Sequence, residues 1–195
     1  MKKIIFAVVI LATSLSLVAF TKKDKSNAAV TFTVNAQRSK VDWIGSKKSD
    51  FHTGYFPVKS GSVQVDGGKL VGGSFVIDVA GLKVTDEGGG PKLQGHLSSA
   101  DFFDISKFGE ATFTINKVEY INADRATIKG DLNLKGTKAS VTFPAIIRSA
   151  DRTEKEKGFF AEAFFPLDRT VFGVSYGVGM IDSEVQLAVH IYASK

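Results

Sequence analysis

The chain has 195 residues, of which 44% are hydrophobic and 23% are charged, a balance that indicates one folded domain rather than a disordered chain. It contains 16 Phe, one Trp and no Cys, so disulfides, thiolate metal sites, iron–sulfur clusters, a Cys nucleophile and a lipoprotein thioether anchor are excluded. The formal net charge of +5 owes much to residues 1–29, which hold five Lys and one Asp; the remaining 20 basic and 19 acidic residues are dispersed, which argues against a nucleic-acid partner.

The first predicted element is a targeting segment. Lys2 and Lys3 precede an uncharged, apolar stretch from Ile4 to Phe20, which is the layout of a secretory signal peptide. We therefore expect residues 1–29 to be a signal peptide, or an uncleaved anchor, with a short polar linker. Residues 30–195 are expected to form a single domain that is periplasmic or secreted.

Alternating apolar and polar residues predict half-buried antiparallel strands along the rest of the chain. The segments with this period are Val30–Val34, Ser74–Asp78, Ala111–Ile115, Ala126–Leu134, Lys138–Phe143 and Glu184–Ala193. Short helices or turns are predicted at Pro91–Leu97, Ser99–Asp104 and Asp168–Phe172. About eight strands with a neutral surface predict an all-β domain, either a closed barrel or a two-sheet sandwich. An eight-stranded barrel is wide enough to hold one small or elongated ligand.

Several stretches of the sequence resemble the YceI-like family. They are Gly54–Val63, Lys69–Asp78, Gly95–Asp104 followed by Ala111–Phe113, Gly130–Gly136, and Leu167–Arg169 followed by Phe172–Gly173. The stretch Gly95–Asp104 is the most specific, and the resemblance extends over residues 30–193. It implies a lipocalin-like, extended antiparallel eight-stranded barrel with one or two short helices. It also implies export to the bacterial cell envelope and an apolar interior that holds a long polyisoprenoid or quinone-like chain.

The aromatic residues form the main candidate ligand site. An isoprenoid chain offers only methyl and olefin surface, so its best host is a dry tube of aromatic and aliphatic side chains. The competing interpretation of each ring is ordinary core packing. The candidate lining residues of this apolar pocket are Trp43, Phe56, Phe75, Ile77, Phe102, Phe103, Phe113, Ile115, Val141, Phe143, Phe165 and Phe172.

Few polar residues qualify as site residues. Arg169 either ties one end of the barrel through an ion pair with Asp168 or Asp182, or contacts a ligand headgroup at the barrel mouth. His96 either fixes its loop through a hydrogen bond or makes a headgroup contact of the same kind. We expect no metal site, because the three His residues share no helix or strand spacing, and we expect no catalytic residues. No cofactor is expected other than a bound isoprenoid lipid or quinone.

Three functions from different classes fit these features. The first is an exported binding protein that holds an apolar isoprenoid-type lipid for transport, storage or sequestration. Such a protein meets a membrane only by transient lipid exchange or through an uncleaved N-terminal anchor, and the sequence leaves a homodimer open. The second is a small integral outer-membrane β-barrel, whose paired aromatic girdles the sequence lacks. The third is an envelope enzyme, for which the sequence shows no pairing of nucleophile and base.

Overall fold

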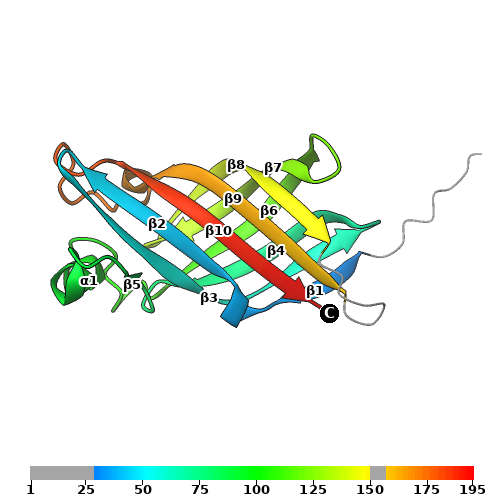
Figure 1. Ribbon diagram of the computed structural model, residues 1–195, viewed down its shortest axis with the longest axis horizontal. Coiled ribbons are helices and arrows are strands. Elements are labelled where there is room, and N and C mark those ends of the chain that lie inside the picture. The colour runs from blue at the N-terminus through cyan, green and yellow to red at the C-terminus, as the bar shows by residue number, and fades with distance from the viewer. Residues whose placement is uncertain (1–28, 150–156) are drawn as a thin grey trace, which may run out of the picture.

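Each of the eight long strands pairs with two neighbours, so that the sheet closes on itself as an antiparallel barrel (Figure 1). The computed structural model describes residues 29–149 and 157–195. Around the barrel the order is β10-β2-β3-β4-β6-β7-β8-β9, and the pairing of β9 with β10 closes the ring. This confirms the predicted all-β, lipocalin-like barrel and excludes the sandwich. The barrel strands are β2 (Lys40–Lys47), β3 (Asp50–Asp66), β4 (Lys69–Asp78), β6 (Glu110–Tyr120), β7 (Arg125–Leu134), β8 (Thr137–Ser149), β9 (Gly158–Asp168) and β10 (Glu184–Ser194).

Two short strands extend this sheet. β1 (Val30–Val34) pairs with β3 and β10 beyond the start of β2, so that it holds the same place in the ring as β2. The 3-10 turn η1 (Ala36–Arg38) separates β1 from β2, and the Asn35 side chain that begins it accepts a hydrogen bond from the Arg38 backbone N–H. β5 (Lys83–Val84) pairs with the first half of β3.

Alternation along each strand divides the barrel wall into an apolar inner face and a polar outer face. On β7, Ala126 and Ile128 belong to the buried hydrophobic cluster, whereas Lys129 beside them is exposed. The outer face carries ion pairs, such as Lys138 Nζ to Asp131 Oδ2 at 3.0 Å. A shift of one residue in register would turn the apolar set outward, so burial of the inner face fixes the pairing.

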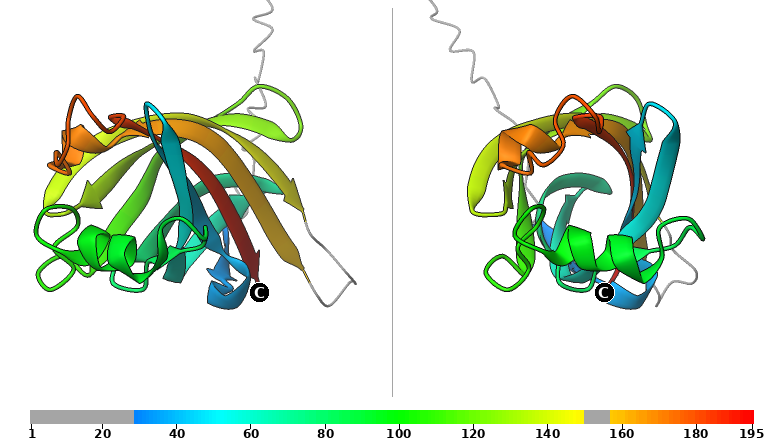
Figure 2. Two further views of the ribbon diagram at one scale, coloured as in Figure 1. Left: turned by 60° about the vertical axis from the view of Figure 1, so that its left-hand side comes forward. Right: turned by 90° about the vertical axis from the view of Figure 1, so that its left-hand side faces the viewer.

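The connections at the two ends of the barrel differ in size. At one end, here called the mouth, lie the β2–β3 and β7–β8 hairpins and the long connections of residues 79–109 and 169–183. The first long connection contains α1 (Gly90–Ser98) and the second begins with η2 (Arg169–Phe172), both at predicted positions. Figure 2 shows α1 lying across the mouth, and Figure 1 shows the C-terminus at the opposite, far end. Within the described part of the chain, no helix is long and apolar enough to cross a bilayer.

The predicted division into a leader (1–29) and a barrel domain (30–195) stays a prediction. Residues 1–28, which carry the predicted signal peptide or anchor, lie outside the described residues.

Trp43 of β2 packs against Gly54, its cross-strand partner on β3. A Cβ at Gly54 would meet the Trp43 ring and the backbone carbonyl of Lys83, whereas a Cβ at Gly45 would meet nothing within 4 Å. We expect Gly54→Ala to lower the free energy of unfolding by about 1–3 kcal/mol through overpacking. Gly45→Ala, the matched control on β2, is expected to stay within about 0.5 kcal/mol of the wild type. Urea denaturation measures both values, and equal stability of the two variants would contradict this packing.

Candidate functional site

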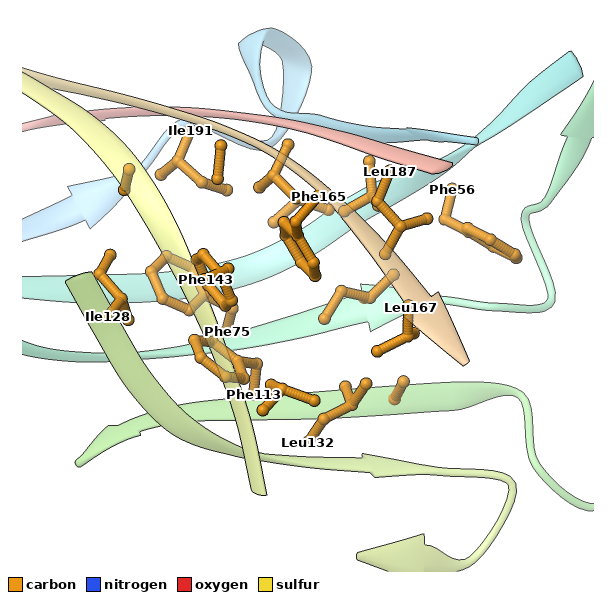
Figure 3. A pocket seen from close by; sticks show the side chains of 18 of the residues that line it. Phe56, Phe75, Phe113, Ile128, Leu132, Phe143, Phe165, Leu167, Leu187 and Ile191 are labelled. Atoms are coloured by element: carbon orange, nitrogen blue, oxygen red, sulfur yellow. The ribbon is translucent and has the colours of Figure 1, made fainter. Parts of the chain in front are cut away.

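The inner faces of the strands enclose an apolar cavity of about 180 Å³, here called the bore (Figure 3). Its lining side chains come from all eight barrel strands and are nearly all aliphatic or aromatic. Two charged residues also touch it, Glu162 and Arg169. The Glu162 carboxylate is engaged elsewhere, at 3.4 Å from Arg148 and 3.5 Å from His190. The bore therefore offers hydrocarbon surface, which suits a ligand segment without polar atoms.

A row of phenyl rings crosses the wall of the bore from β4 to β9 (Figure 3). The ring centroids of Phe75 and Phe113 lie 6.3 Å apart, and those of Phe113 and Phe143 lie 5.6 Å apart. Phe143 stacks on Phe165 at 4.3 Å with an interplanar angle of 4°. Ring contacts of this kind are favourable beyond the area that they bury. The rings thus pack on one another and line the bore at once.

A second cavity of about 210 Å³, here called the mouth chamber, lies between the barrel and α1. Phe56 and Phe103 line both cavities, and their rings meet edge to face with centroids 5.4 Å apart. Arg169 and Val185 also line both cavities, so the two cavities adjoin at these four residues. The full lining of the mouth chamber is Trp43, Gly45, Ser46, Lys47, His52, Phe56, Leu93, His96, Leu97, Phe102, Phe103, Arg169, Val174, Ile181 and Val185.

All but one of the predicted lining residues lie on the bore, on the mouth chamber or on both. Phe172 lines neither cavity and is fully buried within η2. The mouth chamber takes Trp43 and Phe102, together with both predicted headgroup contacts, Arg169 and His96. The bore takes Phe56, Phe75, Ile77, Phe103, Phe113, Ile115, Val141, Phe143 and Phe165.

Most of the aliphatic side chains that line the bore were not predicted from the sequence. The predicted lining consists mainly of aromatic residues and includes only three aliphatic ones, Ile77, Ile115 and Val141, although the same alternation also marks other branched side chains on the inner face. The omitted lining residues include Val58, Leu70, Ile128, Leu132, Leu187, Val189 and Ile191.

Arg169 is buried and ties together the connection that follows it. Its guanidinium donates to the backbone carbonyls of Asp182 (3.0 Å), Val174 (2.6 Å), Tyr176 (2.9 Å) and Ile181 (3.2 Å). Burial lowers the pKa of Arg169 from its usual value. Four of its five N–H donors are thus used to hold residues 173–183 in place.

Asp86 anchors the segment that leads into α1. Its Oδ1 lies 2.9 Å from His52 Nδ1 and accepts from the Gly89 backbone N–H at 2.7 Å, while its Oδ2 accepts from the Thr53 N–H at 2.9 Å. The hydrogen bond from His52, followed by that from Thr53, lowers the pKa of Asp86 to about 2. The carboxylate therefore links β3 to the start of α1.

Side chains of α1 contact both long connections of the mouth, residues 79–109 and residues 169–183. Gln94 accepts a hydrogen bond from the Val84 N–H at 2.9 Å and donates to the Leu82 carbonyl. His96 Nε2 lies 3.1 Å from Asp101 Oδ2, and its ring meets that of Tyr176 edge to face at 4.6 Å. α1 itself buries no residue, so these polar and ring contacts position it.

The whole barrel is similar in sequence to one family of known proteins. Residues 19–193 match the YceI-like domain. Protein YceI of Escherichia coli O157:H7 is 35% identical over 99 residues, and that of Salmonella arizonae is 32% identical over 99 residues. In both cases the matched segment covers 49% of this chain and 50% of the relative, so the chain spans about half the length of these curated relatives.

Solved structures share the fold. The crystal structure of Burkholderia cenocepacia BcnA superposes with a TM-score of 0.67 and 23% identity, covering 82% of this chain and 99% of BcnA. A polyisoprenoid binding domain from Saccharophagus degradans, implicated in plant cell wall breakdown, gives a TM-score of 0.62 and 13% identity. That match covers 83% of this chain and 97% of the domain.

The low pKa of Asp86 predicts acid sensitivity of the mouth. A carboxyl whose pKa is lower in the folded state adds stability that is complete above its unfolded value of about 3.8 and is lost as the pH falls toward about 2. We expect Asp86→Asn to reduce the free energy of unfolding at pH 5 to 7, and the difference from the wild type to shrink between pH 4 and 2. Denaturation at several pH values measures this, and a difference that is constant with pH would be inconsistent with it.

Proposed function

This chain belongs to the YceI-like domain family, and on that premise we propose that it is an exported protein that binds an apolar isoprenoid-type lipid inside its barrel. The lipid is a polyisoprenoid or quinone-like chain, held for transport, storage or sequestration in the cell envelope. The observation that carries this proposal is the bore, whose walls are hydrocarbon along all eight strands. Transfer of apolar surface from water into such a space gains about 25 cal/mol per Å².

The charges of the barrel surface favour a carrier over an integral outer-membrane barrel. A barrel that spans a membrane presents an apolar band to the lipid. Here the outer faces of the strands carry ion pairs, including Lys59 with Glu110, Lys117 with Glu119 (2.7 Å) and Lys40 with Asp42 (2.8 Å).

The polar residues of the mouth favour binding over catalysis. Arg169 is engaged with backbone carbonyls, and His52 and His96 are each paired with a carboxylate. His190 lies near two further carboxylates on the outer wall, at 3.5 Å from Glu162 and 3.7 Å from Asp42. These groups have structural partners, which supports a binding role for the site.

Exposed apolar side chains around the mouth give the lipid a route from a membrane. The exposed fractions of Phe51, Val178 and Met180 are 59%, 57% and 72%. The Asp182 N–H donates to the Ser46 carbonyl at 2.9 Å, which holds residues 173–183 beside the β2–β3 hairpin. We define the rim as these side chains and their exposed neighbours, which are Ile44, Phe51, Val171, Tyr176, Val178 and Met180. The rim would contact the bilayer during lipid exchange.

Filling the bore tests the proposed lipid site. Ala163 of β9 is buried and lines the bore, so Ala163→Trp would occupy the space that the lipid needs. We expect at least a tenfold drop in bound polyisoprenoid per chain, measured by mass spectrometry after loading. Phe164→Trp, on the same strand but 57% exposed, is the matched control and keeps full loading. Ala163→Leu provides a graded variant if the larger side chain prevents folding, and full loading of folded bore variants would refute the site.

Charging the rim tests the proposed exchange with a membrane. The double variant Val178→Asp, Met180→Asp is expected to slow lipid uptake from phospholipid vesicles about tenfold, because charged side chains enter the interface poorly. Val71→Asp with Ile121→Asp is the matched control, since both residues are exposed apolar residues at the far end. Equal uptake rates for the two double variants would show that the mouth is not the route.

A further inference from the structure

The mouth chamber is where the end of a bound lipid would lie. The bore and the chamber meet at the Phe56–Phe103 pair, which lines both together with Arg169 and Val185. A chain that fills the bore and passes this pair places its terminal group among the side chains of the chamber. The chamber lining includes further polar residues, among them Trp43, Ser46 and His52.

Trp43, one of the residues that line this chamber, carries an unused hydrogen-bond donor. Within residues 29–149 and 157–195, its Nε1 is the only buried side-chain nitrogen or oxygen atom without a hydrogen-bond partner. The residue is 7% exposed, and its ring is held by close packing against Gly54. An indole N–H can only donate, and leaving a buried donor unpaired costs free energy. A ligand oxygen that accepts this hydrogen bond would remove that cost.

The cationic and histidine side chains that line the chamber already have partners, so a phosphate group would find few free hydrogen-bond donors there. The guanidinium of Arg169 is directed to four backbone carbonyls, and His52 and His96 lie beside Asp86 and Asp101. Lys47, which also lines the chamber, has Asp50 at 3.6 Å. A diphosphate brought into this chamber would be desolvated beside cations that already have partners, which is unfavourable.

We propose that Trp43 donates a hydrogen bond to a neutral oxygen acceptor on the lipid headgroup, a quinone carbonyl or an alcohol, and that the mouth chamber selects such headgroups over diphosphates. This inference rests on the proposed lipid-binding function and names the headgroup class that the site takes. Nε1 is shielded from solvent, so contact with the headgroup requires the surrounding side chains or α1 to shift. Leu93 and Leu97 of α1 line the chamber, and α1 buries no residue, so its displacement uncovers no core side chain of its own.

The test compares four ligands with isoprenoid tails of equal length: a quinone, an alcohol, a diphosphate and a hydrocarbon without a headgroup. Equilibrium binding of the radiolabelled ligands is measured for the wild type and for Trp43→Phe, which keeps an aromatic ring but lacks the N–H. We expect the substitution to weaken binding of the quinone and the alcohol about tenfold and to leave the hydrocarbon unchanged. The wild type is expected to bind the diphosphate more weakly than the quinone. Tyr55→Phe, a comparable loss of one polar atom outside both cavities, is the matched control and changes none of these affinities.

A spectroscopic signal separates this role from a merely structural one. Trp43 is the only tryptophan of the chain, so a ¹⁵N-labelled sample gives one indole N–H resonance. The quinone and the alcohol are expected to move its proton signal downfield, as a new hydrogen bond does, whereas the hydrocarbon leaves it in place. Equal losses of affinity for all four ligands, an unmoved indole signal, or diphosphate binding as tight as quinone binding would overturn the inference. Failure of every ligand to bind the wild type would instead overturn the proposed function.

Discussion

Closure of the sheet forces every second side chain of eight strands into one enclosed space, and the rest of the structure follows from what fills that space. Aliphatic side chains and phenyl rings line this space around a cavity of about 180 Å³, so water gains little by entering it. Rings such as Phe143 and Phe165 stabilise the wall by stacking and present the same surface to a ligand. The stability of the barrel and its binding of a lipid therefore depend on the same buried residues. A change that opens the barrel is expected to damage both.

The sequence predicted the parts of this arrangement that depend on local alternation. β7 could be located because Ala126 and Ile128 alternate with polar neighbours. β9 was not predicted, because its Phe residues occur in two adjacent pairs, Phe159–Phe160 and Phe164–Phe165. Of these, Phe159 is buried on the inner face and Phe164 is exposed on the outer face. Paired rings remove the contrast between the two faces on which a period of two depends. Phe172, predicted to line the pocket, is instead buried at the end of η2, where no strand periodicity applies.

The mouth could be predicted only in outline, because its geometry depends on connections that are distant in the sequence. Arg169 was a candidate for a headgroup contact or for an ion pair, and the structure shows four backbone carbonyls around its guanidinium. That environment exists only once residues 173–183 have folded around it. The burial of Trp43 likewise depends on the strand register, which sets its ring against Gly54. No local pattern of residues predicts the surroundings of Arg169 or of Trp43.

The bore is proposed to be a lipid site rather than a solid core. Mass spectrometry of the intact protein, purified from its own cells without detergent, tests this proposal most directly when followed by solvent extraction and analysis of what is released. We expect about one elongated isoprenoid-type lipid per chain, released on unfolding and not merely adhering to the surface. Protein that is folded but free of lipid, and that takes up none when isoprenoid chains are offered, would contradict the claim.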